Sequence, residues 1–429
     1  MRARIMACGL AALVAFPVFL AAQPPGDLRV ARLIKQLGSQ SFADRTVATN
    51  ELERLGPTAR QQLTAAAQDP DPEVRLHAKD LLARLDVRDL WAASEASCTA
   101  APISASKLLA VIGEQTGNHL LLGDQYGTFH EHEMTLEPGK QPFWPLVDRI
   151  CQASGNRVRP HFDPRQPGLV IVSGDPGKYP VAYAGPIRGQ LTTARRSFNE
   201  ELSYETSESD VSHLFQIGLQ LAWEDRFHLV AYRSQPDIVS ATTAQGVKLP
   251  LAATAAGTWN VASPGTRQVS TTLRLQPPPI AARELDALVL RWALIAVGDM
   301  ATIEIKDFAS HEPHFQDDVE LSVESVQANG AGQYAVTLRI TRDLTIPEPA
   351  EVIFQENEIE LFDAQQKPFR NQGQTNTLSE DGAKMVVNFV GDSAESVPQR
   401  MTFTYPRLRS QKEVELVFRH VPLPVTRPE

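Results

Sequence analysis

The segment HLFQIGLQLAWED, residues 213–225, alternates apolar and polar side chains along its length. Phe215 and Ile217 fall on one face, whereas Gln216 and Gln220 fall on the other. Because successive side chains of a β-strand point to opposite sides of its sheet, this pattern predicts a strand with one buried and one wet face. A chain built from such strands is restricted to folds in which each sheet covers a core on one side.

Similar strand patterns recur at short intervals from residue 178 onward, most clearly in STTLRLQ, LVLRWALIAV, DVELSVESV, QYAVTLRIT and EVELVFRHV. Turn sequences such as NGAG and SPGT separate them, and the whole chain contains 31 Pro and 25 Gly. Short alternating strands between turns are typical of antiparallel β-sandwiches. We expect two β-rich domains, residues 178–275 and 280–425, divided at LQPPPIAARELDAL because three prolines cannot continue a central strand.

Residues 27–88 have the periodicity of helices and contain an internal repeat. SFADRTVATNELERL (41–55) superposes on DPEVRLHAKDLLARL (71–85) at an offset of 30 residues. The matched pairs are Arg45 and Arg75, Ala48 and Ala78, Leu52 and Leu82, Arg54 and Arg84, and Leu55 and Leu85. The pattern resembles a HEAT-type pair of helical hairpins. The alternative is a small helical bundle that caps the next domain, since repeat arrays generally contain three or more units.

Residues 100–175 predict a small domain of two helices and a sheet. The first helix, in ISASKLLAVIGEQTG, ends at Gly117 and leads into a short apolar strand, LLL. A second helix starts near Pro142 and ends at Gly155, and the strands RVRPH and LVIVS follow it. The expected fold class is therefore multidomain α+β, with helices first, a two-helix sheet domain next, and mostly antiparallel sheet after it.

The run LLAVIGEQTGNHLLLG, followed by MTLEPGKQPFWPLVDRICQASGNRVRPHFDPRQPGLVIVSG, resembles the short N-terminal domain of secretins and TonB-dependent receptors. In that family a helix ending in QTG, a strand, a second helix and a closing strand pair recur. The same run, with the HEAT-like segment before it and VAYAGPIRGQL and LQLAWEDRFHLVAYR after it, is similar to a family of secreted planctomycete proteins of unknown role. The resemblance implies a recognition or docking module rather than an outer-membrane pore.

The N-terminal segment, residues 1–22, begins with Arg2 and Arg4, continues with an apolar run and ends in Ala21 and Ala22. This order is the pattern of a secretory signal peptide, with an uncleaved anchor as the alternative. No later apolar run approaches the roughly 20 residues that cross a bilayer as a helix. We expect an extracytoplasmic protein, periplasmic or secreted, without a transmembrane segment after cleavage.

The charge balance argues against two classes of partner. The chain has 41 Lys and Arg against 51 Asp and Glu, a net charge of −10. An acidic chain without a basic patch opposes sequence-independent binding to nucleic acid or to anionic lipid. The partner that we expect is a protein or a cell-envelope component.

Two segments crowd together side chains that can bind metals, HEHE at 130–133 and HEPHFQDD at 311–318. Neither supplies the His-Glu-x-x-His spacing of a zincin helix. The flanks of the first predict a strand, on which His130 and His132 share a face with Met134 and the two glutamates point away. The second is expected to be a loop. The candidate metal ligands are His130, His132, His311 and His314, which need a further ligand from elsewhere, and a solvated strand and loop are the alternatives.

Cys98 and Cys151 are the cysteines that remain once the signal peptide is removed. In an oxidising compartment they can form one disulfide, although two buried free thiols fit the sequence nearly as well. Cys151 lies on the apolar stripe of its predicted helix, which favours a core residue over a nucleophile.

The sequence contains no Gly-x-Ser-x-Gly elbow, no phosphate-binding glycine loop and no Cys-x-x-Cys pair. The leading hypothesis is a non-catalytic extracytoplasmic binding or scaffold protein, without a cofactor, that mediates protein–protein or envelope-component interactions. One alternative is a metal-binding protein or metal-dependent hydrolase that uses the histidine pairs. Another is an accessory protein of a secretion or transport apparatus.

Overall fold

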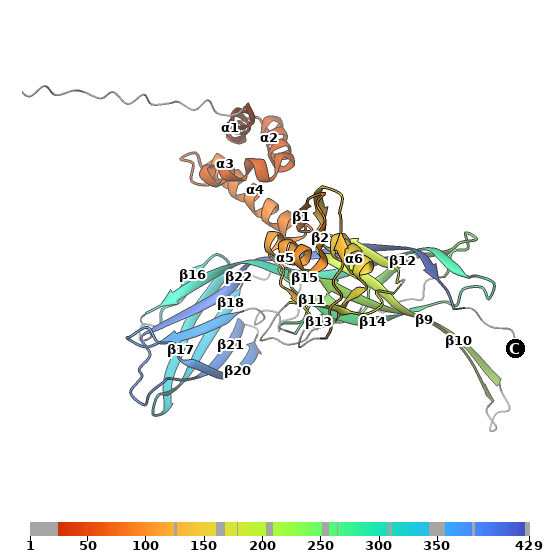
Figure 1. The fold of residues 1–429 in the computed structure, drawn as a ribbon. Coiled ribbons are helices and arrows are strands. Elements are labelled where there is room, and N and C mark those ends of the chain that lie inside the picture. The colour runs from red at the N-terminus through yellow and green to blue at the C-terminus, as the bar shows by residue number, and fades with distance from the viewer. Residues whose placement is uncertain are drawn as a thin grey trace, which may run out of the picture. The chain divides into compact units, whose positions relative to one another are not determined.

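The structure, a computed structural model, describes residues 25–123, 127–159, 168–177, 179–202, 209–250, 257–263, 265–306, 308, 311–342, 357–379 and 382–424. The expected signal peptide, residues 1–22, lies outside the described residues. The chain divides into two compact units, residues 1–86 and 87–429 (Figure 1). The architecture is α+β and consists mostly of antiparallel sheet, as predicted.

The first unit is helical. Its helices are α1 (Pro25–Leu37), α2 (Phe42–Leu55), α3 (Pro57–Ala66) and most of α4 (Pro72–Leu90), whose residues 87–90 belong to the second unit. The hydroxyl of Ser41 accepts a hydrogen bond from the backbone N–H of Asp44 and so caps α2. Gly56 ends α2 with a φ of 54°, a conformation that favours glycine, and Pro57 then starts α3. Buried leucine and alanine side chains from all four helices form its core.

The 30-residue repeat of the sequence is also a repeat of contacts. Nη1 of Arg45 donates to the carbonyl of Ser39 at 2.6 Å, and Nη1 of Arg75 donates to the carbonyl of Asp69, also at 2.6 Å. Each arginine thereby ties its helix to the loop that precedes it. The arginines matched by the offset therefore have the same structural role in both halves, and the matched Ala48 and Ala78 are both fully buried.

The second unit begins with a small α/β domain. Its elements are β1 (Glu95–Cys98), β2 (Ile103–Ser104), α5 (Ala105–Thr116), β3 (Leu120–Leu122), β4 (Glu133–Met134), β5 (Gly139–Pro142), α6 (Phe143–Ser154), β6 (Asn156–Arg159) and β7 (Leu169–Ser173). Strand β3 pairs with β7 in parallel, and β6 pairs with β7 antiparallel. Both helices end at the predicted glycines, Gly117 and Gly155, in the left-handed conformation. The buried faces of α5 and α6 share one core with β3 and β7.

Two sheets enclose a larger core after this domain. The first is antiparallel, in the order β14-β10-β9-β8, and its strands are β8 (Val181–Ala184), β9 (Ile187–Leu202), β10 (Ser209–Trp223) and β14 (Gln268–Leu275). The second contains β11 (His228–Arg233), β12 (Asp237–Thr243), β13 (Trp259–Val261), β15 (Glu284–Ile305), β19 (Glu358–Phe362) and β22 (Arg400–Pro422). The alternation predicted for β10 is confirmed, because Phe215, Ile217, Leu219 and Leu221 are all buried in the core between the sheets.

A further five-stranded sheet lies at one end of this unit (Figure 1). Its strands are β16 (His314–Gln316), β17 (Val319–Gly330), β18 (Gln333–Arg342), β20 (Arg370–Ser379) and β21 (Gly382–Val390), in the order β16-β17-β18-β21-β20. It packs against β19 and the adjoining ends of β15 and β22 around a second hydrophobic core.

The paired strands β15 and β22 form a long ribbon that serves both cores. On β15, Trp292 and Leu294 face the first core, whereas Ile303 and Ile305 face the second. These two pairs differ in parity, so opposite faces of the ribbon cover the two cores. Asp299, which has a φ of 53°, lies between Ala296, which faces the first core, and Ile303, which faces the second.

The division of the β-rich region differs from the predicted one. The proline run at 277–279 does separate β14 from β15, but Leu273 of β14 and Leu288 of β15 belong to the same core. The chain passes from the first hydrophobic core to the second within β15, and not at the proline run. A proline run ends a strand, whereas a domain boundary depends on which strands pack together across the chain.

Candidate functional site

A polar cleft of about 340 Å³ lies in the second unit, between the small α/β domain and the first β-sheet. Its described lining comes from α6, β6, the segment 176–181 and the strands β9 and β10. Ligand sites commonly occupy such junctions between separately folded layers, at volumes of roughly 300–1,000 Å³.

The outer face of the four-stranded sheet forms one wall. Gln190 of β9 lies opposite Gln220 of β10, and Val181 of β8 lies opposite Gln190. Directly opposed residues of an antiparallel pair share a face. Because Leu219 and Leu221 point into the core, the alternation turns Gln220 outward to the cleft.

A buried ion pair forms the back of the cleft. Nε of Arg188 donates to Oδ2 of Asp148 at 2.7 Å, and the hydroxyl of Tyr183 donates to the same oxygen at 2.6 Å. Nη1 of Arg188 donates to Oε1 of Gln190 at 2.5 Å. Burial and the neighbouring carboxylate of Asp148 raise the pKa of the Tyr183 hydroxyl, so it remains a donor. No described residue accepts a hydrogen bond from Nη2 of Arg188.

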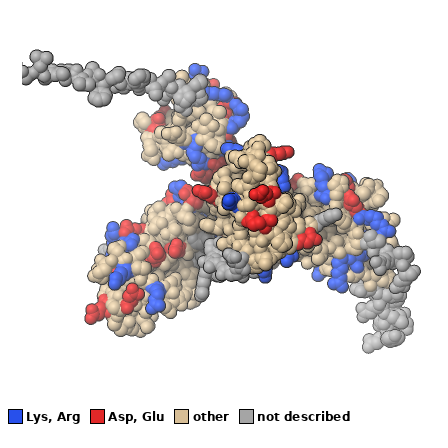
Figure 2. Space-filling model, viewed as in Figure 1, with Lys and Arg blue, Asp and Glu red and all other residues tan. Residues whose placement is uncertain are grey.

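Strand β6 adds two more arginines to the lining, Arg157 and Arg159. Both are exposed, and Arg157 makes no ion pair with any described residue. Its side chain runs alongside Gly174, where an added Cβ would lie only 2.7 Å from Nε. Elsewhere, charges of both signs occur on each unit, as the face in Figure 2 shows. The cleft is therefore locally basic in an acidic chain.

The two cysteines are free and buried in the structure, which matches one of the two states that the sequence left open. Burial raises the pKa of the Cys151 thiol to about 12, so the thiol stays protonated at neutral pH. Burial also raises the pKa of Cys98. Although Cys151 borders the cleft, it lies there as a packed thiol and not as a nucleophile.

The strand predicted for His130 and His132 is mostly absent, because only Glu133–Met134 pair as a strand in this segment. The side-chain amide of Asn156 takes the place of a neighbouring strand: its Oδ1 accepts from the N–H of His130, and its Nδ2 donates to the carbonyl of His130. Both histidines are exposed, whereas Met134, predicted to share their face, is buried.

The second histidine pair lies at the five-stranded end sheet. His314 begins the short strand β16, where a loop was predicted, and His311 precedes it with a φ of 50°. Nδ1 of His311 donates to the carbonyl of Val323 at 2.8 Å. Among the described residues, no three His, Cys, Asp or Glu side chains lie close enough together to hold a metal ion. The structure therefore does not bring the four candidate histidines into one site.

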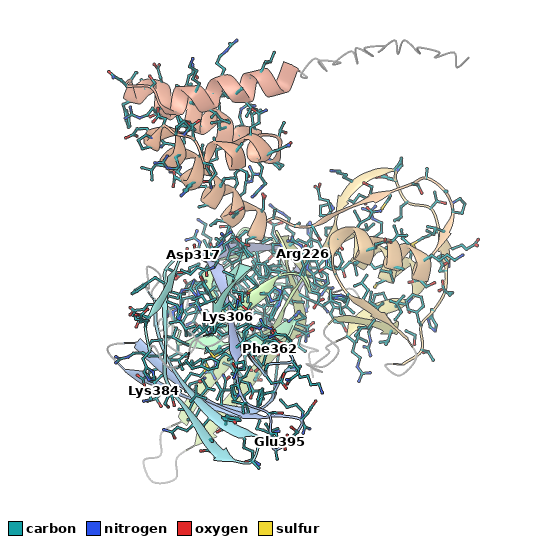
Figure 3. The ribbon with its side chains drawn as sticks, turned by 90° about the vertical axis from the view of Figure 1, so that its left-hand side faces the viewer. Arg226, Lys306, Asp317, Phe362, Lys384 and Glu395 are labelled. Carbon is teal, nitrogen blue, oxygen red and sulfur yellow. The ribbon has the colours of Figure 1, made fainter. Side chains whose placement is uncertain are left out.

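The turn Glu224–Asp225–Arg226, after β10, attaches the small α/β domain on a second side. Glu224 is fully buried and accepts from the N–H of Ser94 at 3.0 Å and from Nε of Arg226 at 2.7 Å. Figure 3 shows Arg226 on the side of the sandwich that faces the α/β domain, and its Nη2 donates to the carbonyl of Ala92.

Asp225 of the same turn makes further contacts between the α/β domain and the sandwich. Its Oδ2 lies 2.6 Å from Nδ1 of His119, and its Oδ1 accepts from Nε of Arg267 at 2.7 Å. Burial alone raises the pKa of Asp225, but the hydrogen bonds from His119 and Arg267 outweigh it, so the net pKa lies below its usual value.

The chain matches no family model, no curated protein and no solved structure. Within the described residues, no helix combines the length and the apolar character that a membrane crossing requires.

Arg157, Arg188 and the turn at 224–226 were not predicted as site residues from the sequence. One signal was available, since IRGQL and NRVR place arginine and glutamine on alternate positions of short strands. That alternation identifies an outward polar face. The alternation does not show, however, that the polar face of β9 and the polar face of β6 line the same cleft.

Proposed function

We propose that the chain is a non-catalytic extracytoplasmic binding protein whose ligand occupies the polar cleft. One observation carries the proposal: hydrogen-bonding side chains from α6, β6, β9 and β10 converge on a single cavity of about 340 Å³. Few, convergent polar groups in a concave site are the usual signature of specific ligand binding.

Two sets of buried contacts support a cleft that is formed before the ligand arrives. On one side, Nε1 of Trp144 donates to the carbonyl of Pro186 at 2.9 Å, beside the pair Asp148–Arg188. On the other side, the turn at 224–226 holds the α/β domain. A preorganised site loses little conformational entropy on binding.

The other parts of the chain fit a role in docking. The helical unit, which resembles a HEAT-type hairpin pair, exposes Phe42, Val47 and Leu76 by 76%, 59% and 63%. Exposed apolar side chains favour protein contacts. The α/β domain resembles the short N-terminal domain of secretins, and the segment 1–22 would send the chain out of the cytoplasm. A protein or an envelope component is the partner that this organisation suits.

Blocking the cleft tests the proposal. The chain from residue 23 onward is immobilised and exposed to fractionated native envelope, and Thr192→Trp fills the cleft from the sheet. Gln152→Trp fills it from α6, so a folding defect in one wall does not explain both results. Thr272→Trp, on an exposed residue of β14 outside the lining, is the matched control.

We expect both cleft variants to lose a specific envelope component that the wild type and the control retain. Equal capture by all four proteins would overturn the proposal.

A further inference from the structure

We infer that the ligand of the cleft is a hydroxyl-rich organic anion of the acidic-sugar type, a sugar ring that carries a carboxylate. The inference rests on the proposed function and names the ligand class for the same site.

The charges of the lining point to an anion. Arg157, Arg159 and Arg188 are the basic residues of the described lining, and Asp148 is its acidic residue. Oδ2 of Asp148 already accepts from Arg188 and Tyr183. With Arg159 left out of the count, Arg157 still adds a positive charge to the described lining, in a chain whose net charge is −10.

The geometry of the arginines suits a carboxylate. A guanidinium presents parallel N–H donors that match the two oxygens of a carboxylate. Arg157 keeps its whole guanidinium clear of ion pairs with described residues, and Arg188 keeps Nη2. Because Arg188 is held by Asp148 and Gln190, it offers that donor in a fixed position.

The rest of the lining suits hydroxyl groups. Gln152, Gln190, Gln220 and Thr192 line the cleft from facing walls. Each amide both donates and accepts, as a sugar hydroxyl does, so the two kinds of group can satisfy each other completely. The carbonyl of Gln190 is occupied by Arg188, which leaves its NH₂ group as the donor. Inorganic phosphate or sulfate would leave most of these amides without a partner.

An aromatic ring stands at the rim. Tyr179 is 43% exposed, and its ring lies against Gly177, where an added Cβ would overlap it. Gly177 has a φ of 67°, so its backbone also favours glycine. A tyrosine so placed offers an apolar face and a polar hydroxyl, a combination suited to an amphipathic sugar ring.

Calorimetric titration of the chain from residue 23 onward tests the ligand class. The probes are D-glucuronate and D-galacturonate, with D-glucose and D-galactose as uncharged rings, acetate as a carboxylate without a ring, and inorganic phosphate. A tri-uronate is also titrated, and comparing its affinity with that of the single sugar shows whether the natural ligand is a polysaccharide or a free sugar acid. We expect one uronate to bind with 1:1 stoichiometry, and the matching neutral sugar and acetate to bind at least about tenfold more weakly.

Variants locate the binding. Arg157→Gln should weaken the uronate by about 10- to 100-fold, as expected for loss of a charged hydrogen bond. Gln220→Leu should weaken both the uronate and the neutral sugar. Arg274→Gln removes the same charge from an exposed arginine of β14 outside the lining and should bind like the wild type.

Three outcomes would overturn the inference: uronates that bind no better than neutral sugars, phosphate that binds better than any uronate, or an Arg157→Gln variant that binds like the wild type. If uronates fail while the tryptophan variants still lose their envelope component, the ligand class is wrong and the proposed function stands. If the tryptophan variants also retain that component, both are wrong.

Discussion

Arg188 and Asp148 join the sheet to helix α6 through a bond of 2.7 Å from Nε to Oδ2, with about a tenth of each side chain exposed. The pair does two things at once. It fastens the α/β domain to the sandwich, and it fixes the back of the cleft.

Asp148→Ala should lower the free energy of unfolding by about 3 kcal/mol, because it leaves the Arg188 guanidinium buried without its carboxylate. Adding Arg188→Met should recover part of that loss. Urea denaturation at neutral pH measures both. Glu413→Ala, which removes one partner of Arg291 in an exposed pair, is the control and should cost below about 1 kcal/mol. If Asp148→Ala and the exposed-pair control lost the same free energy of unfolding, burial would not explain the effect of the Asp148–Arg188 pair.

Arg45→Ala and Arg75→Ala should destabilise the helical unit by similar amounts, about 1 to 2 kcal/mol each, because each removes a charged donor from an equivalent loop carbonyl. Thermal unfolding followed by circular dichroism measures the effect. Arg32→Ala on α1, an exposed position, should be nearly neutral. A large effect at only one of the two repeat positions would show that the contacts are not equivalent.

Asp225 should make stability depend on pH below its ordinary pKa of 3.8. Its pKa is lowered in the folded chain, so its stabilisation is complete above 3.8 and is lost as the pH falls through the folded value. The urea midpoint of the wild type should therefore approach that of Asp225→Asn in acid. A gap between the two midpoints that stays constant down to the lowest pH would refute this assignment.

Cys151 should resist alkylation in the folded protein. With a pKa of about 12, almost none of its thiol is ionised at pH 8, and the side chain is 2% exposed. Iodoacetamide followed by intact mass measurement should show no modification of Cys151 before unfolding, and alkylation of both Cys98 and Cys151 after unfolding in urea. Rapid native labelling would contradict the packed state, and a mass two hydrogens lower would reveal a disulfide.

Arg196→Met should raise the free energy of unfolding by about 1 to 3 kcal/mol. Arg196 lies opposite the buried Phe215, and its Nε, Nη1 and Nη2 are buried without a described hydrogen-bond partner. Replacing such a charge by an apolar side chain of similar length removes its desolvation cost. Chemical denaturation checks the sign, and a loss of stability would mean that a partner satisfies the guanidinium.

Local patterns predicted the local structure well. The alternation of Phe215 and Ile217 identified the buried face of β10, and Gly117 and Gly155 marked the ends of α5 and α6. These features depend on neighbours within a few residues. The repeat at an offset of 30 also survived, since Arg45 and Arg75 make matching contacts.

Long-range features were not predictable in the same way. Trp292 pairs with Val414 across more than a hundred residues, and no local pattern specifies that register. The segment at His130 was predicted as strand because its own alternation allows one, yet the amide of Asn156 satisfies the backbone there. The cleft depends on the contact between Arg188 of β9 and Asp148 of α6. The sequence of each element predicts its own strand or helix but does not show that the two elements pack together.

The ribbon of β15 and β22 carries the end sheet as a separate module of the chain. The described residues between Asp299 and Arg407 leave the first core at one point of the ribbon and return to it at the directly opposite point, where the two side chains are bonded. The intervening sandwich therefore has the topology of an insertion into a hairpin. Deleting residues 300–406 and closing the ribbon with a tight turn would keep the first core, the α/β domain and the cleft within one shorter chain.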